Sequence, residues 1–271
     1  MSRVSEHNSW EEVGQNRGES YPNDNELLIR TMNKGKNMTI PEIKRRLRSL
    51  ADKEKARLLQ GFFKTGPGQY GEGDVFLGIT VPALRKLAKD CRGTTIADSL
   101  ALLRSELHEQ RVLALFLLIH AYAEGDAAAK KRIYAAYLRN TRYINNWDLV
   151  DLSAPHIVGG HLADKSRKPL YALARSRDLW KKRIAIVATL RFIRNDEHAD
   201  TLAIAEMLLR DDHDLIHKAV GWMLREVGKR DLRTLEGFLQ EHCRSMPRTM
   251  LRYAIERFPE PKRLRYLKGK V

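Results

Sequence analysis

The chain has 271 residues, 43% of them hydrophobic and 31% charged, which is typical of a soluble globular protein with one large domain or two small ones. Lys and Arg number 49 against 34 Asp and Glu, and the resulting net charge of +15 favours a polyanionic partner, most simply nucleic acid. An anionic membrane surface and a basic surface without a ligand are the alternatives. No apolar run is long enough to span a membrane and no secretion signal begins the chain, so we expect a cytoplasmic protein without a membrane partner.

The first 37 residues differ from the rest in composition. They are rich in Asn, Gly, Ser and Glu, show no sustained helical period, and carry five basic and six acidic residues, so the remaining chain has a charge of +15 − (−1) = +16. We expect residues 1–37 to be a flexible tail and residues 38–271 to form the folded domain. Thr39 and Glu42 have the spacing of a helical capping box, with Pro41 in the first turn.

Helical patterns follow one another from there, with almost no sign of strands. Apolar residues at helical spacing predict the first four helices at Ile40–Ala51, Lys53–Phe63, Val81–Arg92 and Ile96–Arg104. The connector Lys64–Ile79 holds five of the 17 glycines but lacks the Lys-Ser/Thr of a phosphate-binding loop. A long loop in a compact helical chain is often functional. Cys91 and Cys243 form no C-x-x-C pair, so we expect no metal and no cofactor.

A repeat begins near residue 108. The first helices of four repeats are expected to start near His108, Asn146, Asp178 and Asp212, about 32–38 residues apart. Their second helices are expected at Ala127–Asn140, Arg167–Arg175, His198–Arg210 and Leu232–Arg244. This spacing predicts an all-α fold, a right-handed α-solenoid of HEAT-like helical repeats with a concave basic face. Aligned repeat positions would place Arg111, Arg183 and Lys218 in a row on that face, suited to a rod-like polyanion.

One repeat departs from the basic pattern and supplies a candidate site. Trp147 and Asp151 are four residues apart and share a helix face, as do Lys218 and Trp222 in the fourth repeat. With Arg183 between them in stacking order, two indoles, one carboxylate and one guanidinium would meet in a basic trough. Each residue also has a structural interpretation: the tryptophans as core, Asp151 as the partner of a neighbouring Arg, and Arg183 as solvated.

The chemistry available to this set is limited by its single carboxylate. A carboxylate can stabilise an oxocarbenium-like sugar and hold a water for attack, but most glycosidic leaving groups also need an acid. Asp148 is expected to face the helix interior or a neighbouring Arg, so it is not an obvious acid. A purine alkylated at N3 or N7 is already cationic and leaves without protonation. Aromatic faces would favour such a cation.

At these residues the sequence resembles the AlkD-like family of DNA alkylation-repair glycosylases, over most of residues 38–271. The resemblance rests on four strings: Trp147-Asp148-x-Val150-Asp151, Lys182-Arg183-x-Ala185, Lys218-Ala-x-Gly221-Trp222-x-Leu-Arg-Glu226 and Phe76-Leu-Gly78-Ile-x-x-Pro82. It implies a HEAT-like solenoid that excises N3- and N7-alkylated purines from double-stranded DNA without a metal. It further implies an abasic product and a lesion that stays stacked. We expect no lyase activity, because no lysine stands out as a Schiff-base nucleophile.

The resemblance also implies roles for individual residues. Asp151 corresponds to the catalytic carboxylate, Trp147 and Trp222 to the aromatic walls, and Arg183 to the arginine at the DNA backbone. Tyr70 corresponds to a further aromatic, although its spacing to Gly78 departs from the family pattern. The further residues expected at the DNA are Arg111, Lys182, Lys218 and Arg248. We expect a monomer; the rival functions are a non-catalytic DNA-structure binder and a HEAT-type scaffold for an acidic protein partner.

Overall fold

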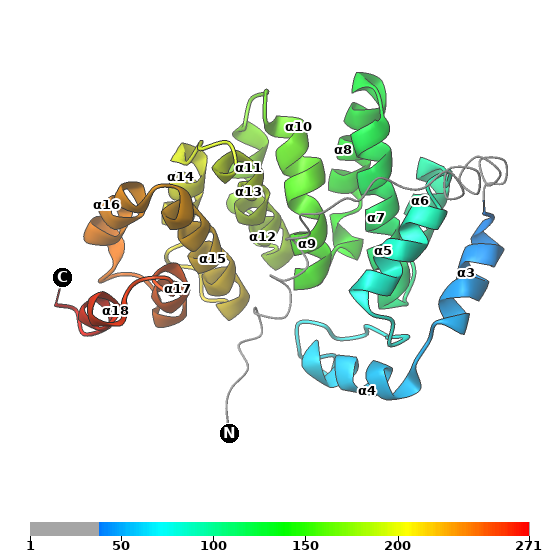
Figure 1. The fold of residues 1–271 in the computed structure, drawn as a ribbon, viewed down its shortest axis with the longest axis horizontal. Coiled ribbons are helices and arrows are strands. Elements are labelled where there is room, and N and C mark those ends of the chain that lie inside the picture. The colour runs from blue at the N-terminus through cyan, green and yellow to red at the C-terminus, as the bar shows by residue number, and fades with distance from the viewer. Residues whose placement is uncertain (1–37, 271) are drawn as a thin grey trace, which may run out of the picture. The chain divides into compact units, whose positions relative to one another are not determined.

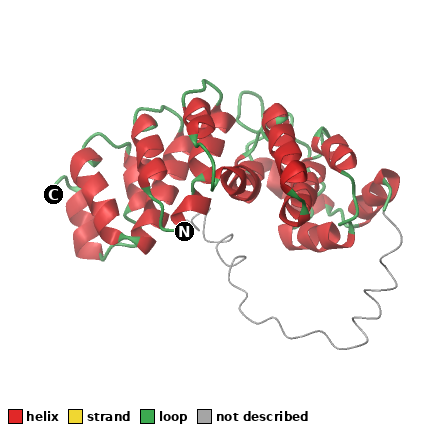
Figure 2. Cartoon of the chain, turned by 90° about the horizontal axis from the view of Figure 1, so that it is seen from above, coloured by secondary structure: helices red, strands yellow, loops and turns green. Residues whose placement is uncertain are grey.

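The computed structural model describes residues 38–270, and the tail expected at residues 1–37 lies outside this range. Within residues 38–270 every regular element is a helix, apart from an isolated bridge between Val75 and Leu107 (Figures 1 and 2). The all-α prediction is confirmed for this part of the chain. The right-handed superhelix and the basic concave face remain predictions.

The four helices expected before the repeats are all present. They are α3 (Ile40–Ser49), α4 (Lys53–Phe62), α5 (Val81–Asp90) and α6 (Ile96–Leu103). The capping residues explain where they begin: the Thr39 amide donates to Glu42 Oε2 at 2.8 Å, and the side chains of Asp52 and Thr95 accept from the first turns of α4 and α6. The buried face of α3 consists of Ile43 and Leu47, the helical spacing that the sequence shows.

The helix pairs of the repeats begin within two residues of their expected positions. Their first helices are α7 (His108–Glu124), α9 (Trp147–Ala154), α12 (Leu179–Ala188) and α15 (Asp214–Arg230). Their second helices are α8 (Ala127–Arg139), α11 (Lys168–Ala174), α14 (Ala199–Met207) and α16 (Leu232–His242). The first helices pack side by side in chain order, each against the next (Figure 1). The candidate residues of α9, α12 and α15 therefore lie on the first helices of three successive repeats, which are neighbours in the stack.

Several short elements lie between these helices or follow the last of them, and they were not expected from the sequence. They are η2 (Thr141–Tyr143), η3 (Pro155–Gly159), α10 (Gly160–Leu162), α13 (Leu190–Ile193), α17 (Arg248–Ala254) and α18 (Glu260–Leu267). The π-helical turn η3 directly follows α9 and begins at a proline, which lacks the N–H that a regular α-helix needs.

Close helix packing depends on glycine at two places. A Cβ on Gly159 would lie 2.3 Å from the carbonyl oxygen of Ala188, and one on Gly221 would lie 2.5 Å from that of Met250. Both distances are too short for any side chain, so these glycines allow η3 to approach α12 and α15 to approach α17. The largest fully buried side chains include two arginines, Arg183 and Arg225, so charged groups belong to the interior of this fold.

Candidate functional site

The centre of the candidate site is an ion pair between Asp151 on α9 and Arg183 on α12. Arg183 donates from Nε to Asp151 Oδ1 at 2.9 Å and from Nη2 to Oδ2 at 2.7 Å. Its Nη1 donates at 2.5 Å to the carbonyl oxygen of Leu215, in the first turn of α15. The Arg183 side chain is 2% exposed and that of Asp151 is 12% exposed. The guanidinium therefore joins three helices and fixes the plane of the carboxylate, and the Asp151 side chain stays partly accessible.

This geometry bears on the interpretations that the sequence left open. Asp151 is the partner of a neighbouring Arg, which is compatible with either role, and the alternative of a solvated Arg183 does not fit its buried side chain. The placement of Arg183 at the DNA backbone is also not what the structure favours, because its guanidinium is committed to Asp151 and Leu215 inside the protein. The sequence gives no sign of this, since a repeat alignment fixes a helix face but not the path of a long side chain.

Trp147 lies one helical turn before Asp151 and is half-buried against the end of α4. Its ring stacks on Phe63 with the centroids 5.1 Å apart and an interplanar angle of 14°. Phe62 meets Trp147 edge-on at 5.9 Å and is itself 39% exposed. At the backbone, the Trp147 amide donates to Asn146 Oδ1 at 2.8 Å, which makes Asn146 the N-cap of α9. The indole is thus held both by its ring and by its backbone.

Trp222 and Lys218 lie one turn apart on α15, both half-buried. Trp222 Nε1 donates to Glu226 Oε1 at 3.2 Å, and Lys218 Nζ lies 3.2 Å from Asp214 Oδ2. Because α12 packs against both α9 and α15, the predicted aromatic, acidic and basic residues come from neighbouring helices. Within this set, the structure links Asp151 directly to Arg183.

The other predicted DNA-binding cations have different environments. The Arg111 side chain is 6% exposed, forms an ion pair with Asp74 and donates to Asn145 Oδ1 at 2.8 Å. The predicted row of Arg111, Arg183 and Lys218 on the concave face therefore does not hold for Arg111 and Arg183, because their guanidinium groups are buried in ion pairs. Lys182 pairs with Asp211, and its side chain is 19% exposed. Arg248 is exposed and donates to the Leu267 carbonyl oxygen at 2.8 Å.

Tyr70 belongs to the glycine-rich connector and lies against the first turn of α12. Its ring meets that of Trp180 edge-on, with the centroids 6.3 Å apart. The connector itself is fastened to α7 by Glu109, whose carboxylate accepts from the amides of three successive residues, Leu77, Gly78 and Ile79, at 2.8, 2.7 and 3.2 Å. The loop that the sequence marks as unusual is therefore an anchored loop.

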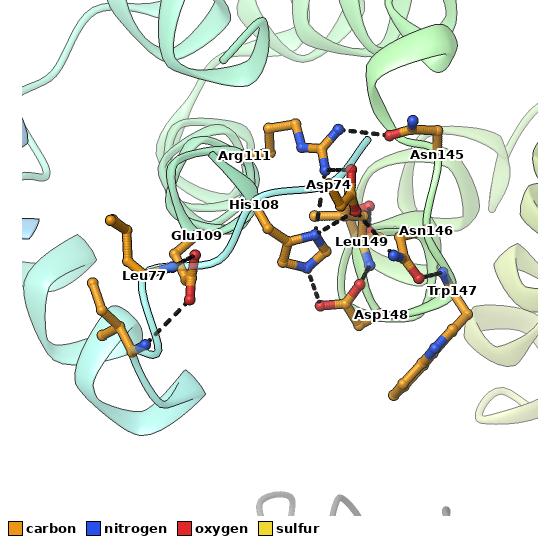
Figure 3. A network of polar contacts seen from close by, with 12 residues as sticks. Asp74, Leu77, His108, Glu109, Arg111, Asn145, Asn146, Trp147, Asp148 and Leu149 are labelled. Atoms are coloured by element: carbon orange, nitrogen blue, oxygen red, sulfur yellow. Dashed lines mark hydrogen bonds and ion pairs between the residues drawn. The ribbon is translucent and has the colours of Figure 1, made fainter. Parts of the chain in front are cut away.

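A buried polar network beside α9 was missed from the sequence. His108, the first residue of α7, places Nδ1 3.0 Å from Asp74 Oδ2 and Nε2 2.7 Å from Asp148 Oδ2 (Figure 3). Asp74 also accepts from Arg111 and, at 3.0 Å, from Nδ2 of Asn146. Asp148 therefore faces a histidine, although the sequence predicted the helix interior or an Arg. No sequence pattern reveals these pairs, which join residues 34, 40 and 72 positions apart.

The network changes the acidity of its members. Burial lowers the pKa of His108, but the two carboxylates outweigh that effect and raise its pKa to about 9. Burial raises the pKa of Asp74, and the hydrogen bond from His108 together with the charge of Arg111 more than reverses this, so that its pKa lies below the ordinary value.

Within residues 38–270, no group of three or more His, Cys, Asp or Glu side chains is arranged to hold a metal ion, and no helix is long and apolar enough to cross a bilayer.

Comparisons with known proteins agree on one family. The family model described as DNA alkylation repair enzyme matches residues 43–258, most of the chain. A solved structure titled as a predicted DNA alkylation repair enzyme from Enterococcus faecalis superposes with a TM-score of 0.61, at 17% sequence identity, covering 78% of this chain and 97% of that one. At this identity the superposition shows a shared fold. A search of curated proteins finds no match.

Proposed function

Because this chain belongs to the family of DNA alkylation repair enzymes, we propose that it is a DNA glycosylase for purines made cationic by alkylation at N3 or N7. It would hydrolyse the N-glycosidic bond in double-stranded DNA and leave an abasic site. The observation that carries the proposal is the carboxylate of Asp151, which Arg183 fixes in one orientation while its side chain stays partly accessible. Trp147 lies one turn away on the same helix.

The reaction needs one carboxylate in this position. As the bond between the base nitrogen and C1′ breaks, its electron pair leaves with the alkylated purine, which becomes neutral, and positive charge develops on the sugar. Asp151 would stabilise that charge and orient a water whose oxygen bonds to C1′. The water then gives up a proton to Asp151 or to solvent. Arg183 acts through Asp151 by holding both of its oxygens.

The surroundings of Asp148 support a restriction to cationic bases. Asp148 is the other carboxylate of α9, but its side chain is 6% exposed. Its Oδ2 faces His108, and its Oδ1 accepts from the Leu149 amide at 2.8 Å. A group so committed cannot protonate a leaving base, and a neutral purine is a poor leaving group without a proton. A purine already cationic through alkylation has no such need, and aromatic faces such as Trp147 and Trp222 would favour its charge.

Binding to duplex DNA would rest on the net charge of +15 and on cations outside the buried pairs. We propose Lys182, Lys218 and Arg248 as phosphate contacts. Their side chains are more exposed than those of Arg111 and Arg183. The enzyme would act as a monomer, without a cofactor and without strand cleavage.

The deciding experiment is release of free base from a panel of duplexes that each carry one lesion. We expect release of 7-methylguanine and 3-methyladenine with no strand nicking, and no release of uracil, hypoxanthine or 8-oxoguanine. Asp151→Asn serves as the matched control on the same substrates. Salt-dependent DNA binding without release of any base would instead support a non-catalytic DNA-structure binder. Efficient release of a neutral base would show that a general acid is present.

A further inference from the structure

The buried network around His108 contains four ionisable groups whose charges balance when both carboxyls are ionised and the imidazole is protonated. Asp74 and Asp148 contribute two negative charges and Arg111 one positive charge, so the cluster is neutral when His108 carries the fourth. Both ring nitrogens of His108 lie within hydrogen-bond distance of a carboxylate oxygen, at 3.0 and 2.7 Å. A neutral imidazole has one N–H and would leave one carboxylate facing a lone pair.

Two separate paths lead from this imidazole to Trp147. The polar path runs through Asp74 to Asn146, whose Oδ1 accepts from the Trp147 amide at 2.8 Å (Figure 3). The second path is a stack of rings. His108 lies on Phe76 with the centroids 4.4 Å apart, Phe76 stacks on Phe63 at 4.9 Å, and Phe63 stacks on Trp147 at 5.1 Å. His108 is thus connected to the backbone of Trp147 by hydrogen bonds and to its ring by stacking.

The network also closes the start of α9. Asn146 and Asp148 accept from the amides of Trp147 and Leu149, two of the first N–H groups that a helix cannot satisfy by itself. Asp151 follows one turn later on the same helix. A shift of this first turn would move Trp147 and Asp151 together, and a displacement of about 1 Å costs a catalytic site a large part of its rate.

We propose that protonated His108 is a positioning residue that sets the first turn of α9, and with it Trp147 and Asp151, for base excision. This inference rests on the proposed function. Loss of the His108 proton would leave net negative charge in a buried cluster and loosen the hydrogen bonds that hold Asn146. The groups that face the imidazole are Asp74 from the connector, Asp148 from α9 and Arg111 from α7. The Glu109 carboxylate, next along α7, is instead turned to the connector amides.

The first test is independent of excision and uses the full chain. In protein labelled with ¹⁵N at histidine, both ring nitrogens of His108 should carry protons at pH 7.5 and lose one of them near pH 9. The indole N–H signal of Trp147, assigned by its absence in Trp147→Phe, should shift with the same midpoint. A neutral His108 at pH 7.5, or a Trp147 signal that does not change as His108 titrates, would overturn the inference.

The second test uses single-turnover release of 7-methylguanine, corrected for spontaneous loss, at pH 6 to 10. We expect His108→Gln to lower the rate at pH 7.5 at least tenfold with a DNA Kd within threefold of wild type, and the wild-type rate to fall near pH 9. The double variant His108→Gln/Asp148→Asn removes one charge of each sign. It should recover part of the rate and lose the fall near pH 9.

Each outcome of the second test has one meaning. A His108→Gln variant that folds, as judged by circular dichroism, and excises at the wild-type rate would contradict the proposal, as would a double variant that keeps the alkaline fall. If His108→Gln fails to fold, the double variant and the histidine titration still test the proposed role of His108. Wild-type protein that releases no base would overturn the proposed function, while the titration of His108 and the response of Trp147 would continue to test the positioning role.

Discussion

Arg183 and Asp151 meet through two parallel hydrogen bonds, 2.9 and 2.7 Å long, between helices that are adjacent in the stack. The same guanidinium holds the carbonyl oxygen of Leu215 on the next helix. A buried bidentate pair of this kind fixes direction as well as charge. The candidate carboxylate is therefore positioned by the packing of three helices rather than by a loop.

Replacing Asp151 by Asn should abolish base release with little change in DNA affinity. The amide keeps the shape of the side chain but loses the charge that would stabilise the sugar, and losses of about 100-fold or more are typical when such an electrostatic contribution is removed. The measurement is single-turnover release of 7-methylguanine with Kd determined on the same duplex. Wild-type excision by Asp151→Asn would refute the assignment.

Replacing Arg183 by Ala should destabilise the protein and lower excision, while the dependence of DNA binding on salt stays as in wild type. Truncation leaves Asp151 without its partner, and breaking a buried pair costs about 3–5 kcal/mol. A phosphate contact would instead lower the salt slope by about one unit, which is what we expect for Lys218→Ala. Urea unfolding and binding at several salt concentrations separate the two roles. A reduced slope for Arg183→Ala would place its guanidinium at the DNA.

Replacing Gly78 by Ala should be much more destabilising than replacing Gly68 by Ala. Both glycines have positive φ, +82° and +72°, so each substitution carries the strain of the left-handed region, about 1–2 kcal/mol. A Cβ on Gly78 would also lie 2.0 Å from the Asp52 carbonyl oxygen, whereas one on Gly68 meets nothing within 4 Å. Thermal unfolding of the two variants isolates the effect of the close approach. Equal melting temperatures would show that the connector can move away from α4.

The stability of the protein should fall as the pH rises from about 6.5 through 9. The folded pKa of His108, about 9, exceeds its ordinary value of 6.5, so its contribution is complete below pH 6.5 and is lost as the folded group deprotonates. The loss would be on the order of 3 kcal/mol. The lowered pKa of Asp74 acts in the opposite sense, through a contribution lost only as the pH falls below about 3.8. Urea unfolding of wild type and of His108→Gln/Asp148→Asn at several pH values measures the difference in stability, which should shrink as the pH rises towards 9 and stop changing once His108 is deprotonated.

The sequence was sufficient to predict what depends on short-range periodicity. The helix pairs begin where the apolar period begins, and Trp147 shares a face with Asp151 because four residues make about one turn. It could not show where Arg183 points, since its long side chain takes the direction that buried neighbours dictate. The His108 network joins three parts of the chain, so it exists only once the connector is folded onto α7 and α9. The turn η3 begins at Pro155, whose missing N–H interrupts the regular hydrogen bonding of an α-helix.

The connector between α4 and α5 also affects how this protein unfolds. In most stacked-repeat proteins each unit contacts only its neighbours, so either end can open by itself. Here Asp74 of the connector is bonded to Asn146, 72 residues later, and Tyr70 rests on Trp180 of α12. These contacts cross-link the N-terminal helices to the second and third repeats. We therefore expect amide exchange to show cooperative opening from α4 to α12, while α18 exchanges on its own, so that unfolding of the described chain begins at one end only.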